Sequence, residues 1–219
     1  MSFPKTVKTV LVSQLRDDIV RGIFQPGERL RLEGLADRYG ISITPLREAM
    51  STLEAEGIIT IQPHKGAVVT SFQADELLSI YEIRATLEKM ATMKAAPLLT
   101  KANLEHLELL VDQMDVVKDD PARFSELNTQ FHSSIYEPAA QKPLFDLIIS
   151  LRYRTQHYLH DYTDDQKRLG MAQAEHRKLL NLFAKKNIEK ASELMYEHVF
   201  KVGESIAKLL RNKELEVAA

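Results

Sequence analysis

The chain has 219 residues, of which 44% are hydrophobic and 27% charged, a balance typical of folded globular proteins with a sizeable core. It has no cysteine, which excludes disulfides and thiolate metal sites, and no apolar run long enough to span a membrane. The net charge of −2 does not point to nucleic acid, so a DNA-binding claim depends on where the basic residues lie.

The first stretch, MSFPKTVKTVLVSQLRDD, meets charged residues too early to be a secretory signal. Together with the lack of cysteine, this favours a cytoplasmic protein. Apolar residues recur at helical spacing between Thr6 and Gly22, which predicts a first helix.

The next fifty residues carry the signals of a DNA-reading module. A short helix stops at Gly40, and another starts at Ser42, a favourable N-cap residue, and closes at Gly57. Two short strands, residues 58–61 and 67–70, follow around a turn. The order helix, helix, turn, helix, hairpin predicts a winged helix-turn-helix domain over residues 1–71.

In such a module the first residues of the second helix of the motif face the major groove. The wing tip can approach phosphates or the minor groove, where a lysine supplies charge and a glycine allows close approach. The candidate DNA-binding residues are therefore Arg31, Ser42, Ile43, Thr44, Pro45, Arg47, His64, Lys65 and Gly66.

From Gln73 onward the sequence shows no strand signal. Six helical stretches are predicted, at residues 74–96, 101–118, 120–137, 144–160, 163–186 and 187–212. Because the connections are short, neighbouring helices are expected to pack antiparallel. We therefore expect a mainly α protein, with an all-α six-helix bundle over residues 72–219.

Four polar residues of this bundle lie on the apolar sides of their helices. Asn128 and His132 are four apart and share one face, while His176 and His198 belong to two other helices. A single inward histidine is more often a hydrogen-bonded core residue, but three imidazoles and an amide oxygen in one bundle suit a divalent metal ion of the Zn, Ni or Mn class. The other histidines, expected on the surface or in loops, are His64, His106, His157 and His160.

The motif GISITPLREAM, with PGERL before it and EAEGIITIQPHKGAVV after it, resembles the recognition helix, turn and wing of GntR-type bacterial repressors. The resemblance covers residues 6–71. That family commonly has arginine where this chain has Ile43, which favours an apolar contact with a thymine methyl over guanine reading at this position. Arg47 remains as the base or phosphate contact.

The second part resembles the FCD effector domain of the FadR subfamily, in its shorter six-helix form, over residues 73–213. The matching motifs are EIRATLE on the first helix, Asn128-x-x-x-His132, Glu175-His176 and Glu197-His198. The resemblance implies a metal ion held by Asn128 and the three histidines, with a small carboxylate effector beside it. Asn128 in place of an aspartate removes one negative charge, which favours an anionic effector.

A cation in a dry cavity favours a carboxylate, and a nearby arginine can bind that carboxylate through two hydrogen bonds. Arg84 shares the inward face of its helix with Tyr81, although it could instead form a structural pair with Glu88, one turn on. Arg152 and Tyr153 on the fourth helix are further candidates, and Arg152 could equally be solvated.

Together these features predict a transcriptional repressor that is not an enzyme. It would read an inverted-repeat operator on double-stranded DNA as a homodimer and respond to a small carboxylate effector. Three alternatives stay open: a sensor for which the metal ion is itself the signal, a bundle with a purely structural metal, and a helical metalloenzyme. No inward carboxylate stands out as a general base for the last of these.

Overall fold

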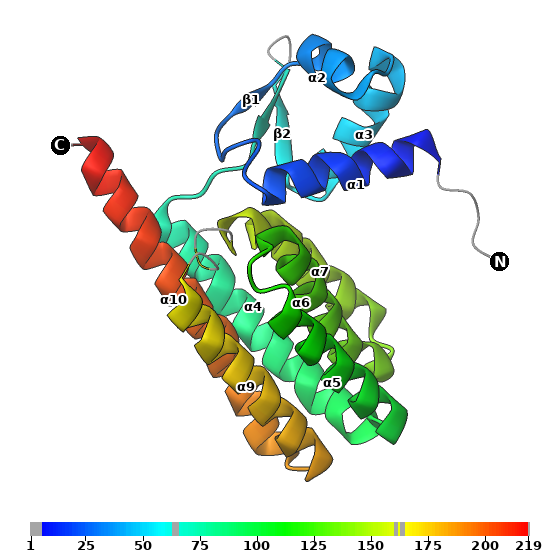
Figure 1. Cartoon of the computed structure of the whole chain (residues 1–219), viewed down its shortest axis with the longest axis vertical. Coiled ribbons are helices and arrows are strands. Elements are labelled where there is room, and N and C mark those ends of the chain that lie inside the picture. The colour runs from blue at the N-terminus through cyan, green and yellow to red at the C-terminus, as the bar shows by residue number, and fades with distance from the viewer. Residues whose placement is uncertain (1–5, 63–65, 160–161, 163–164, 219) are drawn as a thin grey trace. The chain divides into compact units, whose positions relative to one another are not determined.

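The computed structural model describes residues 6–62, 66–159, 162 and 165–218, and it divides the chain into two compact units between Phe72 and Gln73. Within the described residues, no helix has the length and apolarity needed to cross a membrane. The N-terminal unit contains α1 (Val7–Val20), β1 (Arg29–Leu30), α2 (Leu32–Tyr39), α3 (Ile43–Ala55), β2 (Ile59–Gln62) and β3 (Gly66–Val69) (Figure 1).

The strands of the N-terminal unit form an antiparallel sheet of order β1-β3-β2, in which Arg29 pairs with Val68 and Ile59 with Val69. The helices close one core, in which Leu15 of α1 and Leu46 of α3 are fully buried. The predicted winged helix-turn-helix is therefore confirmed. Strand β1 was not predicted, because two residues are too short to show a strand pattern.

Gly66 is the first residue of β3 and has a φ of +89°, a backbone conformation that residues other than glycine rarely adopt. A Cβ at this position would lie 2.9 Å from the backbone oxygen of Leu30. The wing glycine is therefore required by the close approach of β1, independently of any contact with DNA.

The C-terminal unit is all-helical in its described residues, so the predicted bundle is also confirmed. It contains α4 (Ala74–Ala95), η1 (Ala96–Leu98), α5 (Lys101–Val116), α6 (Pro121–Tyr136), η2 (Glu137–Ala139), α7 (Lys142–Thr155), η3 (Gln156–Tyr158), α9 (Gln166–Ala184) and α10 (Ile188–Ala218). Local signals set several starts: Thr100 forms a capping box, and Asp120 and Asp165 accept hydrogen bonds from first-turn amides.

Helix α4 is the central element of this unit. It packs along α10 more extensively than any other pair of elements and also contacts α6 and α7 (Figure 1). Gly203 of α10 permits this approach, since a Cβ there would lie 2.3 Å from the Cβ of Tyr81. Because α4 is covered on several sides, polar residues along it are carried into the interior.

Candidate metal centre and DNA-binding surface

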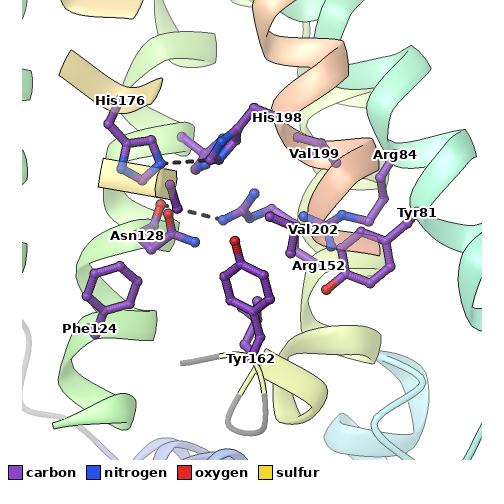
Figure 2. A pocket seen from close by; sticks show the side chains of 13 residues that line it. Tyr81, Arg84, Phe124, Asn128, Arg152, Tyr162, His176, His198, Val199 and Val202 are labelled. Carbon is purple, nitrogen blue, oxygen red and sulfur yellow. Dashed lines mark hydrogen bonds between the residues drawn. The ribbon is translucent and has the colours of Figure 1, made fainter. Parts of the chain in front are cut away.

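Three histidines from three helices converge in the bundle. His132 of α6, His176 of α9 and His198 of α10 are all buried, and one ring nitrogen of each lies within 4.8 Å of the others. The ring centres of His176 and His198 are 4.7 Å apart, and those of His132 and His198 are 5.4 Å apart. Figure 2 shows the His176 and His198 rings side by side at the edge of one cavity.

The hydrogen bonds of His176 and His198 fix which ring nitrogen faces the cavity. His176 Nδ1 donates to Gln173 Oε1 at 2.7 Å, and His198 Nδ1 donates to Glu175 Oε2 at 2.8 Å. Gln173 Nε2 itself donates to Asp115, which leaves its oxygen for His176. Each Nε2 of a neutral ring then carries a lone pair, and the two Nε2 atoms are only 3.2 Å apart.

His132 follows the same pattern. Its Nδ1 lies 3.2 Å from Tyr136 Oη and 3.2 Å from a carboxylate oxygen of Glu88, and Tyr136 donates its own proton to Glu88. Three imidazoles that bind outer acceptors through Nδ1 and leave Nε2 free are the usual arrangement around a protein-bound metal. Facing lone pairs repel, so the donor set fits a cation between them.

The protonation states of His132 and His176 also suit a metal. Burial lowers the pKa of His132 to about 3, with a further contribution from the Arg152 charge. Burial likewise lowers the pKa of His176 well below its ordinary value, and the neighbouring His198 and His132 add to this. Neutral imidazoles at neutral pH are the form that binds a metal ion.

The fourth predicted ligand, Asn128, is half-buried on α6 and lines the same cavity, one turn before His132. Figure 2 places it directly below His176, while its backbone oxygen accepts a hydrogen bond from Arg152 Nη2 at 3.5 Å. The structure thus brings all four residues predicted for the metal to one place.

The cavity beside them is small, with a volume of about 30 Å³. That is room for an ion or a water molecule or two, and less than a typical organic ligand needs. Tyr162 reaches across it from the chain segment before α9 (Figure 2). An organic acid could enter only if lining side chains such as Tyr162 moved.

Sequence reasoning gave Glu88 of α4 only one possible role, as a structural pair for Arg84, but its side chain is fully buried and has more partners than that. Its Oε1 accepts from Arg84 Nη2 at 3.1 Å, and its Oε2 lies 3.3 Å from Arg152 Nη1 and accepts from Tyr136 Oη at 2.6 Å. Burial by itself would raise the pKa of Glu88, but Arg152 and Arg84 hold it well below the ordinary value. From the sequence no inward carboxylate stood out as a general base; the structure places Glu88 inward as the partner of two arginines.

Glu88 therefore joins the histidine cluster to the arginines proposed for the effector. The i, i+4 spacing of Arg84 and Glu88 was the available signal, and the structure realises that pair. Arg84 also donates to Thr155 Oγ1 at 3.0 Å and stacks 4.6 Å from the ring centre of Tyr81.

Three of the four predicted effector residues line the cavity: Tyr81, Arg84 and Arg152. Among the described residues, the buried Tyr81 hydroxyl and the Arg152 Nε make no hydrogen bond, so both can donate to a ligand. Tyr153 does not line the cavity, which corrects that assignment. It follows Arg152 by one residue and so points about 100° further round the helix.

The remaining histidines give one correction. His157, expected at the surface or in a loop, is buried in η3, where its ring centre lies 4.2 Å from that of Tyr158. His106 on α5 is exposed. His64 and His160 lie outside the described residues.

In the N-terminal unit, the predicted DNA-reading residues lie at the start of α3. Ser42, Ile43, Thr44 and Arg47 are exposed, while Pro45 is half-buried. Ser42 occupies the N-cap position, but its hydroxyl makes no capping hydrogen bond and stays available.

Two more predicted DNA contacts flank this helix start. Arg31 is exposed directly before α2, and Gly66 opens β3. His64 and Lys65 of the predicted wing tip lie outside the described residues.

Comparison with known families decides what these two units are. Residues 8–69 match the profile of bacterial regulatory proteins of the gntR family, and residues 79–200 match the FCD domain. The chain belongs to the GntR family and carries an FCD domain. It is a DNA-binding transcriptional regulator of that family, and the family contains regulators rather than enzymes.

Several regulators of this family are similar along most of their length. The chain is 32% identical over 201 residues to the HTH-type transcriptional repressor GlaR of Escherichia coli K12, covering 84% of this chain and 89% of GlaR. It is 29% identical over 194 residues to the regulator YdhC of Bacillus subtilis, covering 85% and 84%. The solved structure of E. coli McbR/YncC has a TM-score of 0.78 at 23% identity over 95% of this chain and 99% of that one, a likeness of fold.

The position of Glu88 gives a first testable expectation. In Glu88→Gln two buried arginines lose their counter-charge, so we expect the free energy of unfolding to fall by about 3 kcal/mol, as when one partner of a buried ion pair is removed. Metal affinity should fall about tenfold or more, because His132 loses an outer partner. Chemical denaturation and metal titration measure these two effects.

Glu108→Gln is the matched control, since Glu108 is an exposed carboxylate on α5 of the same unit. Equal stability of the two variants would show that Glu88 contributes no more than a surface carboxylate.

Proposed function

We propose that the chain is a repressor whose operator affinity changes when a small organic acid binds beside a divalent metal ion in the FCD cavity. The observation that carries the proposal is the convergence of three histidine Nε2 atoms beside free arginine and tyrosine donors. The change in DNA binding would be produced by the N-terminal unit, in which the start of α3 faces the DNA.

In this proposal His132, His176, His198 and the Asn128 amide hold an ion of the Zn, Ni or Mn class. The bound ion would supply positive charge that attracts a carboxylate. The Asn128 amide is uncharged, and burial lowers the pKa of His132 and of His176, so these three side chains cancel none of that charge. An anion is therefore favoured over a neutral or cationic effector.

The acid itself would be read by donors that the protein leaves unused. Among the described residues, Arg152 Nε and the Tyr81 hydroxyl make no hydrogen bond, although the other two nitrogens of Arg152 contact Glu88 and the Asn128 backbone oxygen. Arg84 is held by Glu88 and Thr155. Charge-assisted hydrogen bonds from an arginine to a carboxylate are among the strongest in proteins. We therefore propose Arg152 as the main anchor of the acid, with Arg84 as its support.

On the DNA side, we propose that two copies bind a short inverted repeat, each placing the start of α3 in a major groove. The acid regulates this binding only if it has different affinities for the DNA-bound and free states. As bacterial DNA is cytoplasmic, the protein would act there.

The cavity volume supports a second candidate, a regulator for which the ion is the signal. A space of about 30 Å³ accepts an ion without rearrangement but not an organic acid. In that case metal removal alone would switch operator binding.

One experiment separates the two candidates. The purified protein is analysed for metal, and the metal-loaded form is screened against mono-, di- and hydroxycarboxylic acids by thermal shift. We expect at least one acid to raise the melting temperature, since a ligand at a hundred times its Kd stabilises by about 2.7 kcal/mol. The chelated protein should lose this response.

If no acid has an effect and chelation changes operator affinity, the ion is the signal. If neither acid nor chelation affects DNA binding, the metal is structural and the proposed regulation is wrong.

A further inference from the structure

The outward face of α4 exposes large apolar side chains although the rest of the helix is covered. Ile83, Met90 and Met93 have 53%, 40% and 51% of their surface exposed. With Ser79 and Thr86, which are also exposed, they follow the alternating three- and four-residue spacing that lets one helix pack against another. We call these five residues the α4 seam.

Charges flank the α4 seam in an ordered way. Glu76 and Glu82 lie in the N-terminal half of the helix, and Lys89 and Lys94 in the C-terminal half. Glu76 and Lys94 have no ion pair among the described residues, while Lys89 bonds Glu193 of α10. One half of the exposed face is thus acidic and the other basic.

We propose that the α4 seam packs antiparallel against the same seam of a second copy. A two-fold axis between Ala85 and Thr86 would oppose Glu76 with Lys94 of the partner subunit, since the two lie about nine residues on either side of it. At 100° per residue both project to the same flank of the seam, as an antiparallel two-fold contact requires.

A second acid–base pair is centred on nearly the same point, although Lys89 also bonds Glu193 of its own chain. Glu82 and Lys89 lie about equally far from that point, and both project to the opposite flank. A parallel arrangement would instead place like charges together. The occupant that matches this face in both shape and charge is therefore another copy of the chain.

The inference rests on the homodimer of the proposed function and assigns its contact surface. The proposed contact and the cavity lie on opposite sides of α4. The inner side carries Tyr81, Arg84 and Glu88, and the outer side carries the α4 seam. A ligand that displaces Arg84 or Glu88 would act on the helix that sets the placement of the two copies.

The absence of cysteine allows a direct test, because any disulfide must join engineered cysteines. Thr86→Cys lies next to the proposed axis, so mild oxidation should link two copies of the full-length protein in high yield. Met93→Cys would lie ~22 Å from its counterpart in the same register and should not be linked. The proposed register is wrong if both variants form disulfide-linked dimers in equal yield. It is also wrong if Thr86→Cys forms none although the protein is dimeric.

Charge reversal tests the contact without any cross-link. Lys94→Glu and Glu76→Lys should each raise the dimer dissociation constant about tenfold, because the axis repeats each altered pair twice. The double variant should restore the wild-type value. Met171→Lys on α9, at another exposed apolar position, should leave the constant unchanged. Sedimentation equilibrium measures all four.

The outcomes distinguish this inference from the proposed function. If both single variants dimerise like the wild type, the interface lies elsewhere and the homodimer stands. If the wild type is monomeric at concentrations that saturate the operator, both the seam and the dimer are wrong.

Discussion

His176→Ala is expected to leave the purified protein almost without metal. The imidazole is one of three that meet in a buried cluster, and its Nε2 lies 3.2 Å from that of His198. Loss of a residue that hydrogen-bonds a metal ligand lowers metal affinity about ten- to a hundredfold. Loss of a ligand itself should lower the affinity further. The metal content per chain, measured by elemental analysis after dialysis, should therefore fall from nearly stoichiometric in the wild type to near background in the variant.

His106→Ala is the matched control, because His106 is an exposed histidine on α5 of the same unit. It should keep full metal content. The acid response should disappear in His176→Ala together with the metal, since in the proposed function the ion would supply the charge that attracts the carboxylate. Full occupancy in His176→Ala would remove that residue from the site.

Arg47→Ala is expected to weaken binding to the specific operator by about 1–3 kcal/mol, or roughly ten- to a hundredfold in Kd. Arg47 is exposed in the first turns of α3, one helical turn after Ile43 and Thr44. The Ile43 side chain cannot donate a hydrogen bond, so we propose Arg47 as the cationic base reader of this helix start. Fluorescence anisotropy with labelled operator, at fixed physiological salt, measures the effect.

The control for Arg47 is Arg21→Ala, an exposed arginine that follows the last turn of α1 and is not among the predicted DNA contacts. It should bind like the wild type. If Arg47→Ala loses affinity equally for operator and random DNA, the residue contacts phosphate rather than a base. Unchanged affinity for the operator would contradict the assignment of α3 as the reading helix.

Much of the fold and part of the site followed from local sequence signals. The starts of α5, α6 and α9 depend on Thr100, Asp120 and Asp165, which act within one turn and are therefore visible in sequence. The same is true of the apolar faces that carry His132 and His176. These signals indicate where the helices lie and that His132 and His176 point inward.

Other features depended on contacts between distant segments. Strand β1 forms only because β3 lies beside it, and Gly66 is required by the carbonyl of Leu30 rather than by its own turn. His157 is buried although its local pattern suggested a surface or loop position. Such effects have no short-range signature, because the partner lies tens of residues away.

The sequence by itself determined a GntR-like head, an all-α bundle and a set of inward histidines. The tertiary structure decided that α4 is covered on several sides, and this places Glu88 between His132, Arg84 and Arg152. A carboxylate in that position is stable only because two cations and a tyrosine compensate for its lost hydration. That compensation is a property of packing, which no periodicity along one helix can encode.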